Sequence, residues 1–195
     1  MQKWDERFSE EGFAYGVEPN DFLREKLENF PVGAKVLCIA EGEGRNALGL
    51  LKRGCEVHGV DLSSVGKEKA LAFTQENGFK MTYEIADLFE YDFGEEKWDG
   101  VVSIFFHCPT RTRMEFHQKL ERALKPGGLY LFEAYAKDQP EFGTGGPKDE
   151  ELLYTTEDFK NSNLEQLHLE GVKREIIEGK YHTGMSSVIQ YLGKK

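Results

Sequence analysis

Glycines early in the chain have the spacing of a loop that binds nucleosides. Residues 40–47 read Ala-Glu-Gly-Glu-Gly-Arg-Asn-Ala, so Gly42, Gly44 and Ala47 fit the pattern G-x-G-x-x-G/A. Glycines in this pattern permit a tight turn, and the helix that follows presents free N–H groups to a ligand. Asp61 follows Gly42 by about 20 positions, where a carboxylate can accept both hydroxyl groups of a ribose. The spacing predicts an adenosine site; a tightly packed glycine turn without a ligand is the alternative.

The charges in this loop distinguish among ligands that contain adenosine. Glu41 and Glu43 contribute two carboxylates and only Arg45 opposes them, so the two phosphates of a dinucleotide would meet like charge at a cost of about 1 kcal/mol or more. S-adenosylmethionine has no phosphate, its sulfonium and ammonium groups are cations, and its one carboxylate can bind the helix N-terminus. We therefore expect S-adenosylmethionine, and S-adenosylhomocysteine as its product. A nucleotide-binding oxidoreductase or dehydratase and a non-catalytic S-adenosylmethionine-binding protein are the alternatives.

Two histidines are candidates for contact with a methyl acceptor. Transfer from a sulfonium is an in-line displacement that depends on alignment and on exclusion of water. His107 follows the fourth predicted strand; with an ordinary pKa of about 6.5 it can remove a proton from the acceptor, or it only orients the acceptor or bonds a loop carbonyl. His182 lies in a predicted turn, which either bends over the site or, as is commoner, faces water. Cys38, Cys55 and Cys108 are too scattered for a zinc or disulfide framework, so no metal is expected.

Alternating strands and helices must position these residues. Along residues 20–135 the alternation predicts a doubly wound, mostly parallel α/β sheet with helices on both faces. The C-terminal part differs, because a helix that begins in the capping-box pattern 155–158 precedes two strands whose link, 179–184, suits a hairpin and not a crossover. We therefore expect an antiparallel hairpin at one edge of the sheet. The predicted strands are 35–40, 56–61, 80–85, 98–106, 129–135, 172–178 and 185–192, and the other predicted helices are 20–30, 45–53, 64–77 and 111–124.

Length and composition indicate a single domain, residues 1–195, with a sizeable core. The chain is 39% hydrophobic, and 25 Lys and Arg against 35 Asp and Glu give it a net charge of −10. Because such a surface repels phosphate backbones and anionic headgroups, neither nucleic acid nor membrane is an expected partner. The N-terminus has no apolar signal segment, and no apolar run approaches the length of a membrane span. We expect a cytoplasmic monomer or homodimer with reduced thiols.

Two segments are candidates to close the site. Within residues 1–30, aromatic side chains such as Trp4 and Tyr15 precede the first predicted helix, and we expect this segment to cap the cofactor. An aromatic face would then meet the sulfonium, and Arg7 the carboxylate; packing as a satellite cluster on the sheet is the alternative. The loop 137–154 is long and rich in glycine, which predicts a substrate lid, with a disordered surface loop as the alternative.

Motifs over nearly the whole length resemble those of one enzyme family. They are Trp4-Asp-Glu-Arg-Phe8, Tyr15-Gly16 with Glu18-Pro-Asn-Asp-Phe22, the loop 40–47, Val60-Asp61, Ser103-Ile-Phe-Phe-His107, Leu124-Lys-Pro-Gly-Gly128 and Gly145-Gly-Pro-Lys148. Together they resemble the small-molecule class I methyltransferases of the tellurite-resistance and thiopurine-methyltransferase type. The resemblance implies a Rossmann-like, seven-stranded sheet whose last strand is antiparallel. It also implies methyl transfer from S-adenosylmethionine to a small-molecule acceptor, with thiols and chalcogen nucleophiles among the acceptors.

The same resemblance implies where the cofactor binds. The glycine loop, 42–44, would hold its methionine part, Asp61 its ribose, and Asp87-Leu88 would flank its adenine. Many class I methyltransferases carry an acidic residue where this chain has Cys38, which leaves open the group that meets the ammonium. Glu41 is a substitute, and a Glu41 side chain that faces solvent is the alternative. The candidate cofactor contacts are Trp4, Arg7, Tyr15, Ala40, Glu41, Gly42, Gly44, Asn46, Asp61, Leu62, Asp87, Leu88 and Ser103. The candidate substrate contacts are His107, which is also the candidate catalytic residue, Gly146, Pro147, Lys148 and His182.

Overall fold

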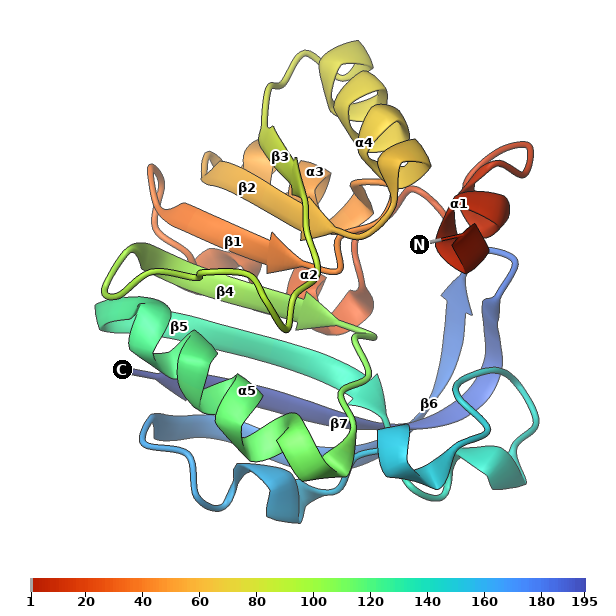
Figure 1. Ribbon diagram of the computed structural model, residues 1–195, viewed down its shortest axis with the longest axis vertical. Coiled ribbons are helices and arrows are strands. Elements are labelled where there is room, and N and C mark those ends of the chain that lie inside the picture. The colour runs from red at the N-terminus through yellow and green to blue at the C-terminus, as the bar shows by residue number, and fades with distance from the viewer. Residues whose placement is uncertain (1) are drawn as a thin grey trace.

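A seven-stranded sheet forms the centre of the molecule (Figure 1). Its strands are β1 (Lys35–Ile39), β2 (Glu56–Asp61), β3 (Thr82–Ile85), β4 (Trp98–Ile104), β5 (Leu124–Tyr135), β6 (Glu165–Glu178) and β7 (His182–Lys194), in a computed structural model that describes residues 2–195. They lie in the order β3-β2-β1-β4-β5-β7-β6. Strands β1 to β5 are parallel, whereas β7 runs antiparallel to both of its neighbours, β5 and β6. The predicted Rossmann-like sheet with an antiparallel C-terminal hairpin is confirmed.

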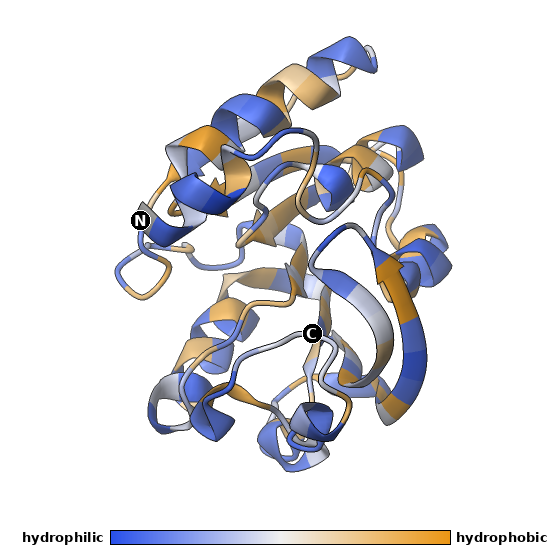
Figure 2. Ribbon diagram, turned by 90° about the vertical axis from the view of Figure 1, so that its right-hand side faces the viewer, coloured by the Kyte–Doolittle hydropathy of each residue, from blue (hydrophilic) through white to orange (hydrophobic). Residues whose placement is uncertain are grey.

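Helices pack on both faces of this sheet. They are α1 (Gln2–Phe8), α2 (Asp21–Lys26), α3 (Arg45–Arg53), α4 (Ser64–Glu76) and α5 (Thr110–Ala123), with the short 3-10 helices η1 (Leu27–Asn29), η2 (Gln139–Glu141), η3 (Glu150–Leu152) and η4 (Thr156–Phe159). On β1, Leu37 and Ile39 are buried with residues of α5, whereas Val36 and Cys38 are buried with residues of α2 and α3. In Figure 2 single helices alternate between hydrophilic and hydrophobic segments, as is typical of helices that bury one face. Within residues 2–195, none of the helices has the length and hydrophobicity that crossing a bilayer requires.

The helix expected near residue 155 is reduced to η4. Its capping box forms, because the Asp158 carboxylate accepts hydrogen bonds from both the N–H and the hydroxyl of Thr155. The chain then turns at Ser162, whose hydroxyl donates to Glu121 on α5 at 2.7 Å, and enters β6 at Glu165. A local cap signal therefore starts a helical turn here, but a tertiary contact with α5 ends it after one turn.

The terminal hairpin is longer than predicted. Strand β6 begins at residue 165 instead of 172 and β7 extends to residue 194 instead of 192. The two strands pair from Glu165 with Lys194 to Glu178 with His182. Strand β6 is the edge strand of the sheet, so many of its side chains face solvent and its apolar pattern is weak. Helix α1 was not predicted, and the expected helix 20–30 is divided into α2 and η1.

Candidate active site

A cavity of about 510 Å³ opens at the carboxyl ends of the central strands. Its lining includes residues 40–43 after β1, residues 61–62 at the end of β2 and residues 105–107 after β4. Strand β1 lies between β2 and β4, so the chain reverses its direction of travel across the sheet at this point. Ligands of open α/β sheets bind at such a point, and the volume is in the range of small-molecule sites.

The loop between β1 and α3 needs glycine at two positions. Gly42 has a φ of +60° and Gly44 a φ of +90°, both in the left-handed region. A Cβ on Gly42 would lie 3.1 Å from Cζ of Phe8, and a Cβ on Gly44 would lie 2.9 Å from Cβ of Ala70. The loop is therefore packed between α1 and α4, and its backbone at Gly42 forms part of the cavity wall.

Glu41 occupies the N-terminus of α3. Its Oε1 accepts a hydrogen bond from the N–H of Ala47 at 2.8 Å, and burial raises the pKa of Glu41 to about 7. We expected the carboxylate of the cofactor at this helix end, where the protein's own carboxyl group already accepts from one N–H group. The pyrophosphate of a dinucleotide uses the same N–H groups, so it would meet Glu41 instead.

Glu43 is paired within the protein. Its Oε2 accepts from the N–H of Ala14 at 2.7 Å, and its Oε1 contacts Nζ of Lys69 at 2.9 Å. From the sequence we expected both glutamates to oppose a phosphate, but Lys69 neutralises Glu43. Discrimination against phosphate therefore rests on Glu41 alone, while Glu43 fastens the N-terminal segment to α4.

Asp61 ends β2 with its carboxylate held from two sides. Oδ2 accepts from the N–H of Gly42 at 3.1 Å and Oδ1 accepts from the N–H of Ser63 at 2.9 Å. The residue is 7% exposed, and burial raises the pKa of Asp61. Each carboxylate oxygen can accept a further hydrogen bond. A fixed carboxylate on the cavity wall suits the two adjacent hydroxyl groups of a ribose.

His107 has one fixed tautomer. Its Nδ1 lies 2.9 Å from the carbonyl oxygen of Leu152, and because a carbonyl only accepts, Nδ1 carries the proton and Nε2 the lone pair. The ring stacks on Tyr135 with centroids 5.8 Å apart. Burial lowers the pKa of His107 to about 4, far below the value of about 6.5 that we expected from the sequence. At neutral pH the group is thus an uncharged hydrogen-bond acceptor and a weak base.

His182 lines the cavity and does not face water. The commoner outcome for a turn residue, a side chain that faces solvent, is therefore wrong for His182. Its ring centroid is 4.2 Å from that of Phe105 and 4.4 Å from that of Tyr15. Burial lowers the pKa of His182 well below its ordinary value. Its Nδ1 and the hydroxyl of Tyr135 are both buried without a hydrogen-bond partner among the described residues. Buried polar atoms of this kind call for a partner, and both residues line the cavity, where a ligand can supply one.

The N-terminal segment and the tip of the β6–β7 hairpin form a roof at one side of the cavity (Figure 1). The N–H of Lys180 donates to the carbonyl of Ala14 at 3.0 Å, and the Arg7 guanidinium lies 4.1 Å from the centroid of the Tyr181 ring. Arg7 also donates to the hydroxyl of Tyr15 at 2.8 Å. Arg7, Tyr15 and Tyr181 all line the cavity, so this contact brings a cation and two aromatic rings to the ligand side.

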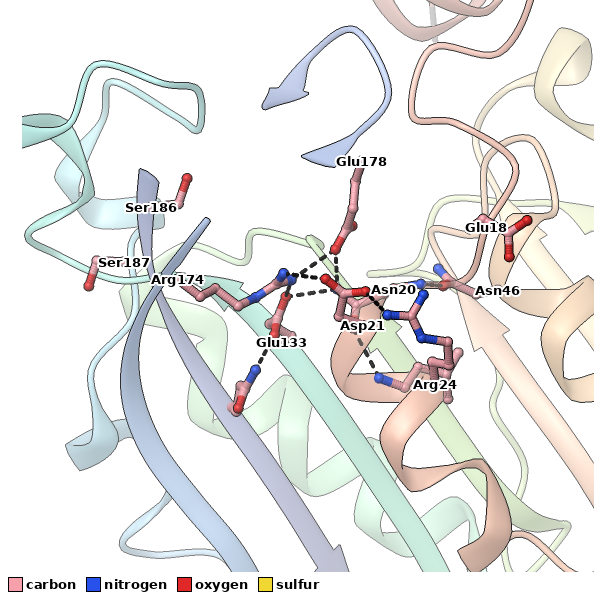
Figure 3. A network of polar contacts seen from close by, with 12 residues as sticks. Glu18, Asn20, Asp21, Arg24, Asn46, Glu133, Arg174, Glu178, Ser186 and Ser187 are labelled. Atoms are coloured by element: carbon pink, nitrogen blue, oxygen red, sulfur yellow. Dashed lines mark hydrogen bonds and ion pairs between the residues drawn. The ribbon is translucent and has the colours of Figure 1, made fainter. Parts of the chain in front are cut away.

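A buried ionic network begins at Glu133 on β5 (Figure 3). The fully buried Glu133 carboxylate accepts from Arg174 at 2.6 Å, from Gln190 at 2.6 Å and from the side-chain amide of Asn20 at 2.8 Å. Burial raises the pKa of Glu133, and Arg174 opposes that shift. Strands β5, β6 and β7 are thereby tied to the N-cap of α2.

The same network reaches the cavity wall through Glu178. This carboxylate accepts from Arg174 at 2.8 Å and pairs with Nη2 of Arg45 at 2.7 Å. The side-chain oxygen of Asn46 accepts from the N–H of Asn20 at 3.0 Å. Because Arg45 and Asn46 both line the cavity, the network fixes the first turn of α3 against the hairpin.

Most of the residues predicted for the site meet at this cavity. Four do not line it: Gly44 packs against α4, Ser103 is buried within β4, Asp87 is exposed with its carboxylate bonded to the N–H of Phe89, and Lys148 is exposed. The predicted residues that line the cavity are Trp4, Arg7, Tyr15, Ala40, Glu41, Gly42, Asn46, Asp61, Leu62, Leu88, His107, Gly146, Pro147 and His182.

Several lining residues were not identified from the sequence. Phe105 and Phe106 follow β4 and Tyr135 ends β5, so the rule that ligands bind at the carboxyl ends of parallel strands was a sufficient signal for them. Tyr181 and Gly16 line the cavity because the N-terminal segment contacts the tip of the β6–β7 hairpin, and no local sequence pattern indicates that contact. The other lining residues not predicted are Lys3, Phe8, Glu43, Arg45, Ile104, Gly145 and Leu152.

Comparison with known proteins agrees with this geometry. A protein-family model described as "Methyltransferase domain" matches residues 36–128, which include the glycine loop, Asp61 and His107. Residues 36–128 therefore resemble a methyltransferase domain. The chain is 31% identical over 126 residues to Phosphoethanolamine N-methyltransferase 2 of Caenorhabditis elegans, and the alignment covers 63% of this chain but only 28% of that protein. The chain therefore spans less than a third of the length of this relative.

Two solved structures show the same fold as this chain. TehB from Haemophilus influenzae is 18% identical with a TM-score of 0.70, over 90% of this chain and 61% of that chain. The 1,6-didemethyltoxoflavin-N1-methyltransferase of Burkholderia thailandensis, with bound 1,6-didemethyltoxoflavin and S-adenosylhomocysteine, is 17% identical with a TM-score of 0.66, over 90% of this chain and 78% of that chain. These two likenesses show the fold alone, while the family model and the relative support the predicted class I S-adenosylmethionine-dependent methyltransferase.

Proposed function

We propose that the protein transfers a methyl group from S-adenosylmethionine to a small-molecule acceptor held beside His107. The observation that carries the proposal is the division of the cavity into two parts. On one side Asp61 offers a fixed carboxylate and Glu41 takes the place of a phosphate. On the other side His107, His182 and Tyr135 present uncharged polar groups within aromatic walls. The first part suits the nucleoside of the cofactor and the second suits an acceptor.

On the cofactor side each lining group has a distinct proposed partner. Asp61 accepts from the ribose hydroxyls, and Leu62 and Leu88 contact the adenine. The backbone at Gly42 follows the methionine part, Glu41 receives its ammonium group, and the carboxylate lies toward Arg7. No carboxylate pairs with Arg7 among the described residues, so its charge is available to an anion. S-adenosylmethionine itself supplies the electrophilic methyl group.

On the acceptor side His107 positions the nucleophile. Its Nε2 accepts a hydrogen bond, but a base with a pKa of about 4 removes protons poorly from an acceptor that is neutral at pH 7. The site therefore favours a soft nucleophile, such as a thiol or a chalcogen anion, that attacks with little help from a base. His182 and Tyr135 hold the acceptor from the hairpin and from β5. The segment of Gly146 and Pro147, within the proposed lid 137–154, closes the same side.

Methyl transfer from labelled S-adenosylmethionine to a panel of acceptors tests the proposal. The panel contains a thiol, tellurite, an aromatic amine and phosphoethanolamine, and we expect the thiol or the tellurite to be methylated fastest. His107→Asn keeps a donor near Leu152 but lacks Nε2, so turnover should fall by about 10²-fold for an acceptor that carries a proton to donate to Nε2, and by less for a fully ionised one. No transfer to any acceptor, in a protein that binds S-adenosylhomocysteine, would favour the non-catalytic alternative. Full activity of the variant would remove His107 from the mechanism.

A further inference from the structure

Arg113 on α5 is buried at 2% exposure and directs its guanidinium at backbone carbonyls. Nε and Nη2 donate to the carbonyl of Cys108 at 3.2 and 2.8 Å. Nη2 also donates to the carbonyl of Glu151 at 3.0 Å, and Nη1 donates to the carbonyl of Leu153 at 3.0 Å. The one ionic partner of this side chain among the described residues is Asp158, 3.0 Å from Nη1. Most of the donors of Arg113 thus form hydrogen bonds with the backbone of two segments that lie far apart in the sequence.

These carbonyls surround a single hydrogen bond, the one that fixes the tautomer of His107. Cys108 directly follows His107, and Glu151 and Leu153 flank Leu152, whose carbonyl accepts from Nδ1 of His107. The same guanidinium therefore bonds to the chain neighbours of both partners of this hydrogen bond. A planar fork with five donors can span two segments in this way, whereas an ammonium group is a point charge with no fixed fork.

Two further contacts hold the same segments. The hydroxyl of Thr110 donates to the carbonyl of Glu151 at 3.0 Å, alongside Arg113. The N–H of Cys108 donates to the hydroxyl of Tyr154 at 3.3 Å, and the guanidinium carbon of Arg113 lies 3.8 Å from the centroid of the Tyr154 ring. Cys108 is thus held at its N–H by Tyr154 and at its carbonyl by Arg113.

We propose that Arg113 is a positioning residue, which clamps the chain after β4 to residues 151–153 and so keeps the proton of His107 on Nδ1 and its lone pair toward the acceptor. The inference rests on the proposed role of His107 for its catalytic meaning, but the clamp itself does not depend on that role. The positive charge of Arg113 acts in the same direction, because it adds to burial in lowering the pKa of His107. An ordinary structural anchor, which only ties α5 to residues 151–158, is the competing explanation.

The tautomer of His107 distinguishes the two explanations. In protein labelled with ¹⁵N at its five histidines, the ring nitrogens of His107 are identified by their loss in His107→Asn. We expect wild type to carry the proton on Nδ1 alone. Arg113→Lys keeps the charge and the pairing with Asp158 but not the fork, so a share of His107 should move its proton to Nε2. Turnover should then fall by about 10-fold, with the KM for S-adenosylmethionine unchanged. This loss is smaller than the about 10²–10⁴-fold that removal of an acid–base group brings.

Asp158→Asn is the matched control, because it removes the ion pair and leaves every carbonyl contact of Arg113 in place. This variant should lose stability without a change of tautomer. Thr110→Val removes the second donor to Glu151 on the exposed side of α5. This variant should shift the tautomer in the same direction as Arg113→Lys, to a smaller extent. It replaces Arg113→Lys in the test if Arg113→Lys does not fold. The wild-type tautomer in both Arg113→Lys and Thr110→Val, or an equal shift in Asp158→Asn, would overturn the clamp. The spectra need neither cofactor nor acceptor, so they stand apart from a failure of the proposed methyl transfer.

Discussion

The carboxyl group of Glu41 should make cofactor binding depend on pH in a defined direction. Burial raises its pKa to about 7, and the nearby charge of Asp61 adds to the shift while Arg45 opposes it. If this group receives the ammonium of the cofactor, it must be ionised in the complex. Below pH 7 each binding event then releases a proton, and ionising the carboxyl group costs about 1.4 kcal/mol for each pH unit below its pKa. The dissociation constant of S-adenosylhomocysteine should therefore rise about 10-fold per unit below pH 7 and level off above about pH 8.

The two histidines at the cavity do not produce the same dependence. Burial lowers the pKa of His107 to about 4, so this group stays neutral between pH 6 and 8, and burial also lowers the pKa of His182 well below its ordinary value. The direction of the Glu41 pKa shift can also be measured without ligand, from the pH dependence of the free energy of unfolding. Because the folded-state pKa of Glu41 lies above its unfolded value, its contribution to stability is complete below about pH 4.5 and is lost as pH rises to about 7, to an extent of about 3 kcal/mol.

Calorimetric titration at pH 6 and pH 8, in buffers of different ionisation enthalpy, measures the released protons directly. Wild type should release close to one proton per bound ligand at pH 6 and close to none at pH 8. Glu41→Gln should release none and should bind more weakly than wild type at pH 8. Glu43→Gln is the matched control, because both oxygens of Glu43 are bonded to Ala14 and Lys69, and this variant should keep the proton release. Wild-type release in Glu41→Gln, or no release by wild type at pH 6, would refute the assignment of Glu41 to the ammonium group.

Three further predictions follow from individual contacts. Asp61→Ala should weaken binding of S-adenosylhomocysteine by about 1–3 kcal/mol by calorimetry, and an unchanged dissociation constant would place the ribose elsewhere. Gly179→Ala should lower the melting temperature and weaken cofactor binding by about 1–3 kcal/mol, because its Cβ would lie 2.4 Å from the carbonyl carbon of Tyr15; Gly12→Ala, with a similar positive φ and open space around it, is the control and should leave binding intact. Tyr135→Phe removes a buried hydroxyl that has no partner in the described residues, so it should raise the KM for the acceptor about 10-fold without lowering the melting temperature, and a fall in melting temperature with an unchanged KM would assign Tyr135 to the core.

The sequence was sufficient for the elements whose signals are local. Apolar strands such as 35–39, buried on both faces, have a continuous hydrophobic pattern, and the glycines of the loop after that strand have their own spacing. The terminal hairpin was found from its short link, but the ends of β6 were not, because an exposed edge strand has a weak apolar pattern. Local spacing thus predicted the order of the elements and the position of the cofactor loop.

The sequence was insufficient where distant segments decide the outcome. Glu133 lies within an apolar strand, and its partners Arg174, Gln190 and Asn20 come from three other parts of the chain. The direction of His182 depends on the roof, and the low pKa of His107 depends on burial that only the folded chain provides. Charge, tautomer and orientation at the site are therefore tertiary properties, although the residue types that carry them were visible in the sequence.

The cavity should bind S-adenosylmethionine and not a dinucleotide. Calorimetric titration of the wild-type protein with S-adenosylhomocysteine and, separately, with NAD at pH 8 tests it most directly. We predict saturable one-to-one binding of S-adenosylhomocysteine, with unfolding stabilised by about 2.7 kcal/mol at a ligand concentration of 100 times Kd, and no heat of binding from NAD. Tight binding of NAD with no response to S-adenosylhomocysteine would contradict the account.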